Sequence, residues 1–276
     1  MDIAEFDLVI EAGRTERHYW MDVWRYRELL YFLAWRDILV RYKQTVIGIA
    51  WALIRPVLTM LVFTVVFGKL ARFPSDGVPY PVLVFCGLLP WQFFSSSLSE
   101  SSNSLIVNSN LVSKIYFPRL VVPASAVITS LVDFLIAGGF LAVLMVWYRF
   151  APDWRMIALP LFTLMAFVAA IGPGLWLAAL NVKYRDFRYV VPFLVQFGLY
   201  ISPVGFSSRI VPETWRLPYY LNPMAGVIDG FRWSILGPGA EIYLPGFCVS
   251  TATILLLAIT GVWYFRKTER GFADVI

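Results

Sequence analysis

The sequence has little of what soluble enzymes usually carry. Charged residues make up only 15% of its 276 positions, against about a quarter in a soluble domain. It has one histidine, His18, and two cysteines, Cys86 and Cys248, both in strongly apolar stretches. One histidine cannot form a cluster, and two such cysteines indicate neither a disulfide framework nor a metal site. We therefore expect no catalytic residue, bound cofactor or metal in this chain.

A phosphate-binding loop for ATP is also missing. That motif has a glycine five residues before a Gly-Lys pair and a hydroxyl residue directly after it. Gly68 and Lys69 have neither. If ATP drives the activity of this protein, a separate chain has to bind the nucleotide.

What the chain has instead is apolar residues, which make up 59% of it, with 17% aromatic residues. The net charge of +5 does not indicate nucleic acid, because the cations are scattered among apolar segments and form no patch. Six runs approach the ~20 residues needed to cross a bilayer, and they cover 46–69, 80–102, 120–148, 156–181, 188–206 and 245–265. The expected fold class is an all-α polytopic membrane protein with six transmembrane helices.

The cations predict the orientation of these spans. Most of the 23 Lys and Arg residues fall in the two terminal segments and in the loops after the second and fourth spans. Because such residues accumulate on the cytoplasmic side, both termini are expected there. The predicted layout is a tail over 1–23, an amphipathic helix over 24–45, the membrane domain over 46–265 and a second tail over 266–276.

The segment 24–45 is too charged to span a membrane. Trp24, Tyr31, Trp35, Ile38 and Tyr42 fall on one side of a helix, and Arg25, Arg36 and Lys43 fall between its apolar stripes. Aromatic anchors with cations beside them are typical of a helix lying in the headgroups. We interpret the segment as such an interface helix; an ordinary soluble N-terminal helix is the alternative.

The loop after the second span predicts a short exposed helix over about 108–118. Asn108, Ser109 and Asn110 can cap it, and Pro118 ends it. The residues expected to contact a partner follow one stripe or flank it: Leu111, Val112, Lys114, Ile115 and Tyr116. Such a helix is long enough to dock in a groove of another protein; the alternative is that it rests on the bilayer.

The outer loop over about 207–244 also has a helical pattern. Its apolar positions recur at helical spacing and end at a Gly-Pro-Gly turn; they are Met224, Val227, Ile228, Phe231 and Ile235. We expect a pair of helices that dip back into the outer leaflet.

Four stretches together resemble the permease subunits of type-2 ABC exporters, in the branch that exports bacterial O-antigen, capsular or teichoic-acid polymers. They are RYKQTVIG at 41–48 with Trp51 and Arg55-Pro56, GLLPWQFF at 87–94 with Lys114 and Pro118-Arg119, NVKYRD at 181–186 with Pro192, Gln196 and Ser202-Pro203, and LNPM at 221–224 with GFRW at 230–233. The similarity runs from about residue 25 to the C-terminus.

This resemblance implies a homodimer in the bacterial inner membrane with two cytoplasmic P-loop ATPase subunits, which bind the ATP and Mg²⁺. It also implies an interface helix, a coupling helix at 108–118 that meets the ATPase, and re-entrant outer helices. The expected activity is ATP-driven export of a lipid-linked polysaccharide. Export of a drug or small lipid by the same kind of permease is the alternative.

A glycan presents CH faces and hydroxyls, so an aromatic lining would let it slide; the candidates for this path are Trp91, Phe93, Phe94, Trp176, Phe197 and Tyr200. Aromatic residues in membrane helices also serve packing or face lipid. Serine and asparagine crowd the chain from Ser95 to Asn110, which predicts that this part of the second span leaves the lipid or lines a wet interior.

Isolated charges in or near the spans have structural and functional readings. Asp133 fits a proton relay in a proton-coupled carrier, but without a second acid at mid-membrane it is expected to hydrogen-bond a neighbouring helix. Arg55 is expected to snorkel or to pair with an acid, and Asp186 to form a local ion pair. A membrane-bound glycosyltransferase or acyltransferase is disfavoured, because no cluster of acids, histidines or metal ligands is evident.

Overall fold

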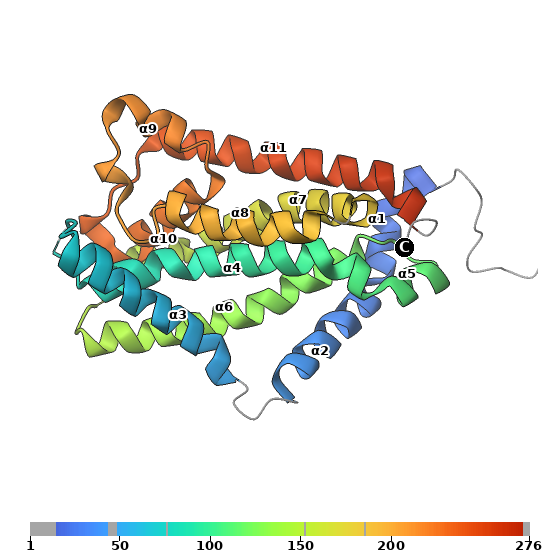
Figure 1. The fold of residues 1–276 in the computed structure, drawn as a ribbon, viewed down its shortest axis with the longest axis horizontal. Coiled ribbons are helices and arrows are strands. Elements are labelled where there is room, and N and C mark those ends of the chain that lie inside the picture. Colours follow the sequence, from blue (N-terminus) through green and yellow to red (C-terminus); the bar gives the residue numbers. More distant parts are fainter. Residues whose placement is uncertain (1–14, 44–48, 76, 152, 185, 273–276) are drawn as a thin grey trace, which may run out of the picture.

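The computed structural model of the chain describes residues 15–43, 49–75, 77–151, 153–184 and 186–272. Much of the expected N-terminal tail, the predicted start of the first span at 46–48, part of the motif at 41–48, Arg185 and the last residues of the C-terminal tail lie outside these ranges. The described residues form helices joined by loops and turns, with no strand among them. The helices lie mostly along one long axis (Figure 1).

Five helices are long and apolar enough to cross a membrane. They are α3 (Ile49–Phe63) continuing into the π-helical η1 (Thr64–Leu70), α4 (Tyr80–Val107), α6 (Val121–Trp147), α7 (Leu159–Lys183) preceded by η2 (Trp154–Ala158), and α11 (Leu244–Thr268) continuing into η5 (Glu269–Gly271). The protein is therefore a polytopic membrane protein.

The predicted fifth span is shorter than expected. Helix α8 (Phe187–Ile201) has 15 residues and ends five residues before the predicted limit of 206. Ser202 is extended, with φ −76° and ψ 151°, because the ring of Pro203 disfavours the helical conformation of the residue before it. The described part of the chain thus contains five long apolar helices and the shorter α8.

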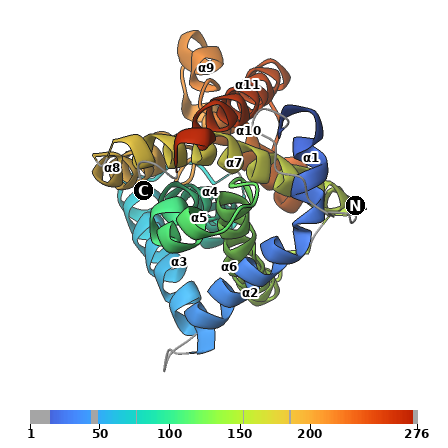
Figure 2. The ribbon, with the colours of Figure 1, turned by 90° about the vertical axis from the view of Figure 1, so that its right-hand side faces the viewer.

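Helix α4 lies at the centre of the bundle. It contacts α3, α6, α7, α8 and α10 (Pro223–Leu236), and the view along the bundle places it among these neighbours (Figure 2). In its most apolar stretch 78% of the residues are buried, against 17% in that of α3. A central helix buried on all sides explains why its apolar residues show no one-sided pattern.

Helices α7 and α11 pack closely because glycines meet at their crossing. A Cβ atom on Gly261 would overlap the backbone carbonyl of Gly172, and one on Gly172 would overlap the backbone of α11 at Ala258. Small residues at such crossings let membrane helices approach until their backbones touch.

The predicted outer helical region contains α9 (Glu213–Tyr219) and α10. Asn222 caps α10 by accepting a hydrogen bond from the backbone N–H of Met224 at 3.0 Å. The apolar residues of the predicted pattern are all buried, and α10 ends at Gly237, whose φ of 68° suits glycine. We call this end of the bundle the α10 end; it lies on the left in Figure 1.

The opposite end, here the α5 end, carries α1 (Thr15–Arg25), α2 (Arg27–Lys43), α5 (Ser109–Lys114) and the end of α11. The helix expected over 24–45 thus corresponds mainly to α2, while α1 lies mostly within the tail expected over 1–23. A small apolar cluster at this end joins them; its larger members include Tyr19, Leu33, Val112, Phe117 and Phe265.

The helix expected over 108–118 is shorter than predicted. It ends at Lys114, because Ile115 is extended with φ −124° and ψ 136°. Pro118 disfavours a helical Phe117, and Phe117 is buried in the cluster at the α5 end. The expected side-chain cap is also wrong: the amide of Asn108 donates to the carbonyl of Ser104 at 2.9 Å, at the end of α4.

Candidate functional site

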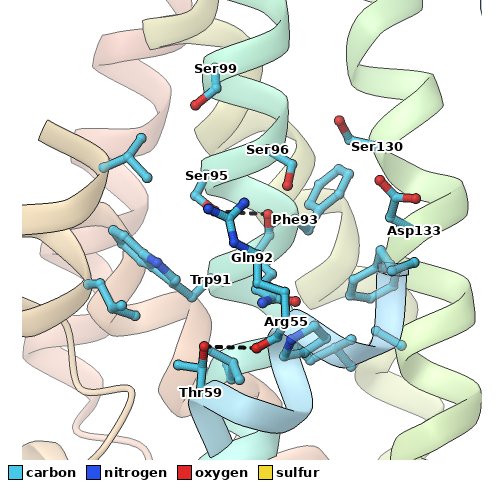
Figure 3. Close-up of a pocket in the computed structure, with 18 of the residues that line it drawn as sticks. Arg55, Thr59, Trp91, Gln92, Phe93, Ser95, Ser96, Ser99, Ser130 and Asp133 are labelled. Atoms are coloured by element: carbon cyan, nitrogen blue, oxygen red, sulfur yellow. Dashed lines mark hydrogen bonds between the residues drawn. The ribbon is translucent and has the colours of Figure 1, made fainter. Parts of the chain in front are cut away.

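A cavity of about 820 Å³ lies between α2, α3, α4, α6 and α8 (Figure 3). The ring of Tyr200 on α8 belongs to its lining, and the centroid of that ring lies 6.3 Å from the ring centroid of Phe63 on α3. At another side, α2 reaches it with Arg41 and Tyr42.

The end of α2 is attached to the spans by hydrogen bonds to two carboxylates. The guanidinium of Arg41 lies 2.5 Å from Asp133 on α6 and 2.7 Å from Glu100 on α4. The hydroxyl of Tyr42 donates to the other oxygen of Asp133. Burial and this hydrogen bond raise the pKa of Tyr42, so the phenol keeps the proton that it donates. Asp133 therefore bonds to α2, which agrees with the prediction that it hydrogen-bonds a neighbouring helix.

Arg55 occupies the cavity without such partners. Its side chain is exposed and extends from α3 towards α4 in Figure 3. Among the described residues its guanidinium forms no hydrogen bond or ion pair; only its carbonyl is bonded, to the hydroxyl of Thr59 at 2.9 Å. The acid partner that the sequence suggested as one possibility is therefore not found in the described part of the chain.

Polar side chains of α4 follow the cavity for more than two helical turns. They are Gln92, Ser95, Ser96, Ser99 and Glu100, and Ser130 of α6 and Gln196 of α8 add to them. Ser95 donates to the carbonyl of Gln92 at 3.1 Å. The polar stretch that the sequence pointed to thus borders an open space inside an apolar bundle.

The structure brings three of the six candidate path aromatics to this cavity: Trp91, Phe93 and Tyr200. Phe94 is buried beside Trp91, at 5.5 Å between ring centroids. Phe197 stacks on Phe193 along the exposed face of α8. Trp176 lies against α11, where its indole N–H donates to the carbonyl of Thr260 at 3.0 Å. The last three do not line the cavity.

At the α5 end, the candidate coupling residues divide into an anchor and an exposed group. Val112 is buried and Leu111 half-buried in the cluster at this end. Lys114, Ile115 and Tyr116 are exposed, and the last two follow the helix in an extended segment. Burial raises the pKa of Tyr116, and the acids Asp22 and Glu269 raise it further.

The candidate interface residues also take different positions. Tyr31 and Trp35 are exposed and stack with their centroids 6.3 Å apart, while Arg25 is exposed on α1. Arg36 bonds to Asp37 at 2.7 Å and to Asn108 beside α5 at 2.8 Å. Tyr42 alone reaches the cavity. Helices α2 and α5 are therefore joined through Arg36 and Asn108.

A second link at this end was not anticipated from the sequence. The hydroxyl of Tyr19 on α1 donates to the carboxylate of Glu269 at 2.9 Å, and Arg119 donates to the backbone carbonyl of Glu269. Burial and the neighbouring Glu269 raise the pKa of Tyr19, so its phenol remains a donor. The chain leaving α5 is thereby tied to the end of α11.

The α10 end contains a buried polar network that sequence reasoning missed. Asp229 accepts hydrogen bonds from Tyr220 at 2.5 Å and from Ser208 at 2.7 Å. Arg232 donates to the carbonyls of Phe206 at 2.6 Å and Val204 at 2.9 Å. An acid and a cation one turn apart in an otherwise apolar helix are the signal that could have found it.

The family described as ABC-2 type transporter matches residues 28–236, which include α2, the cavity, α5 and α10. The O-antigen export system permease protein RfbA of Myxococcus xanthus is 30% identical over 92% of this chain and 98% of its own length.

The chain belongs to the ABC-2 type transporter family. Other relatives of this ABC-2 permease cover less of it: the polysialic acid transport protein KpsM of Escherichia coli is 24% identical over 81% of this chain and 84% of its own. The inner membrane transport permease YadH of Escherichia coli strain K12 is 26% identical over 75% and 85%. The predicted resemblance to this family is confirmed, and the chain is a transport permease and not an enzyme.

Proposed function

We propose that this ABC-2 permease exports a lipid-linked polysaccharide, such as O-antigen or a related glycan, across the bacterial inner membrane. It acts as a homodimer with two cytoplasmic P-loop ATPase subunits that bind ATP and Mg²⁺. The observation that carries the proposal is the cavity, in which hydroxyl and amide groups of α4 lie beside the aromatic residues Trp91 and Tyr200. Two relatives that match most of the chain support it, an O-antigen export permease and a polysialic acid transport protein.

The lining of the cavity suits a sugar polymer. Serine hydroxyls and glutamine amides can exchange hydrogen bonds with sugar hydroxyls, and aromatic rings offer flat apolar faces to sugar CH groups. An apolar drug would gain little from the hydroxyls and would leave them unpaired when it displaced water. Export of a drug or small lipid stays the alternative, because the name of one relative, the inner membrane transport permease YadH, states no substrate.

A second copy of the chain would complete the path. Helix α8, beside the cavity, presents apolar side chains to the outside, among them Phe193 and Phe197. Gln196, Leu199 and Tyr200 of α8 line the cavity, while Phe193 and Phe197 lie on its exposed face, as in a helix that meets a partner or lipid on one side. In a homodimer, the α8 faces of the two copies would enclose one path that joins the two cavities.

The α5 end is assigned to the cytoplasm, with six membrane-crossing helices of which α8 is the shortest, and both termini on the inner side. The cations of the terminal segments and of the loops at that end support this orientation. Lys114, Ile115 and Tyr116 would contact the ATPase. The bonds from Arg36 to Asn108 and from Arg119 to Glu269 would carry its movement to α2 and α11.

In-cell crosslinking tests the coupling assignment. A photoreactive residue at Tyr116 is expected to capture a P-loop ATPase, identified by mass spectrometry. The matched control is the same photoreactive residue at Trp154, which is exposed at the opposite end and should capture none. Capture at both positions, or at neither, would contradict the proposed docking site.

Loss of the gene tests the substrate. Cells without the permease should accumulate a lipid-linked glycan on the cytoplasmic side, and the intact gene should restore its export. If cells without the permease export the glycan normally but no longer export a drug or small lipid, the alternative is favoured instead.

A further inference from the structure

Two arginines of the cavity differ in what they bond. Arg41 is paired with both acids of the lining, Asp133 and Glu100. Arg55 has no partner for its guanidinium among the described residues. A negatively charged ligand at Arg41 would meet two carboxylates, whereas at Arg55 it would meet a cation whose donors are unused.

An unpaired guanidinium inside a membrane helix is unfavourable. Charges at such positions are usually paired or mark the path of a ligand. Arg55 lies well inside α3, next to Pro56 and within the most apolar stretch of that helix. Its environment therefore fits a side chain that is satisfied by a ligand and not by the protein.

The hydroxyls of α4 that face the cavity supply a second, independent observation. Ser96 and Ser99 line the same space as Arg55, and neither hydroxyl bonds to another described residue. Figure 3 draws both on the part of α4 towards which Arg55 extends. Serine hydroxyls can rotate to donate to an anionic oxygen, so the cation has neutral donors available beside it.

The helix that carries Arg55 also offers an apolar track. Leu58, Leu61 and Val62 follow Arg55 along α3 and are exposed. An anion held at Arg55 could thus be attached to a hydrocarbon chain lying along α3 and to a polar group extending into the cavity. A free inorganic anion would make no use of this track.

We propose that Arg55, with the hydroxyls of Ser96 and Ser99, binds the phosphate or pyrophosphate ester that joins the lipid to the glycan. The inference rests on the proposed function, because it takes a lipid-linked glycan as the substrate. The planar guanidinium can bind two phosphate oxygens at once, which a lysine cannot do in the same geometry. Arg41 is bonded to the two acids of the cavity lining, so the anion binds at Arg55 instead.

The test measures binding of geranylgeranyl pyrophosphate to the full chain in nanodiscs of phosphatidylcholine, a lipid without net charge. Arg55→Gln should weaken binding about 10- to 100-fold, the range for a lost charge-assisted hydrogen bond. Arg55→Lys should recover part of the affinity because the charge remains. The control Arg188→Gln removes an exposed cation of α8 outside the cavity and should leave binding unchanged.

Competition experiments distinguish the sources of the phosphate. Inorganic pyrophosphate, which lacks the chain, and phosphatidylglycerol, which has a single phosphate diester, should each displace the prenyl probe only weakly. Unchanged affinity in Arg55→Gln, or phosphatidylglycerol binding as tightly as the probe and equally dependent on Arg55, would overturn the proposal.

Binding and export are measured separately, so that the two proposals fail in different ways. Arg55-dependent binding of the probe in a protein whose loss leaves glycan export intact would remove the proposed function and keep a prenyl-phosphate site. Glycan export that depends on the protein, but proceeds normally in Arg55→Gln with unchanged probe binding, would remove the site and keep the function.

Discussion

Arg232 and Arg55 are both cations of apolar helices, and their surroundings are opposite. Arg232 is 4% exposed at the α10 end and donates to two carbonyls. Arg55 is exposed in the cavity and its guanidinium bonds to no described residue. A buried charge has to be satisfied by the protein itself, whereas a charge in an open cavity can await a ligand. The α10 end is thus closed, with the guanidinium of Arg232 bonded to the protein except at its Nε, and the cavity side is open.

The largest effect is expected at the closed end. Arg232→Met keeps much of the side-chain length but leaves the buried carbonyls of Val204 and Phe206 without their donors. At about 1–3 kcal/mol for each buried group left unsatisfied, the protein should lose about 2–6 kcal/mol of stability. Thermal unfolding of the purified protein in detergent measures the loss. A midpoint equal to that of the wild type would show that the network does not hold the α10 end together.

A smaller loss is expected where α7 crosses α11. Gly261→Ala places a methyl group against the backbone carbonyl of Gly172, which cannot move aside as a side chain could. Separating the two helices should cost about 1–3 kcal/mol. Gly139→Ala in α6 is the matched control, because nothing lies within 4 Å of its added Cβ. Equal unfolding midpoints for the two variants would refute the close crossing.

The link between α2 and the cavity wall should contribute little to the stability of the protein and should mainly hold the end of α2 in place. Asp133→Asn removes the carboxylate that Arg41 and Tyr42 share, and these side chains are partly exposed. The expected stability loss is about 1 kcal/mol or less, together with faster hydrogen exchange at the end of α2.

The control for this link is Asp37→Asn, which removes an acid that pairs only within α2, with Arg36. It should leave hydrogen exchange at the end of α2 as in the wild type. Equal exchange in both variants would mean that Asp133 does not hold α2 against α6.

The smallest effect on stability is expected at Arg55, which sharpens the contrast with Arg232. Arg55→Gln breaks no bond of its guanidinium with a described residue, so the unfolding midpoint should match the wild type, within about 0.5 kcal/mol of free energy. A loss comparable to that of Arg232→Met would place Arg55 among the structural charges and remove the basis for a ligand site.

Much of the fold could be predicted from local sequence. The apolar runs marked the long helices because about 20 apolar residues are the main requirement for a span. The spacing of Met224, Phe231 and Ile235 identified α10. The limits of α5 and α8 were misjudged, because the residue before a proline turns extended and tertiary burial of Phe117 draws the chain away from the helix.

The site was less predictable, because side chains that meet come from distant segments. Arg41 and Asp133 are 92 residues apart. In the sequence, Arg41 is only one of several cations ahead of the first span, and nothing near it indicates its partner. Trp176 and Tyr200 looked equally suited to a path, yet one lies against α11 and the other in the cavity. Aromatic residues on membrane helices carry no local mark of which face they occupy.

The sequence by itself determined the family, the approximate place of the apolar helices and the lack of an ATP-binding motif in this sequence, because each depends on local composition or on motifs contiguous in the chain. Only the tertiary structure decided which charges are satisfied: Asp133 by α2, Asp229 and Arg232 within the α10 end, and Arg55 by no described residue. The physical reason is that a hydrogen bond between side chains depends on how helices pack, and packing joins residues whose separation along the chain is unrelated to their distance in space.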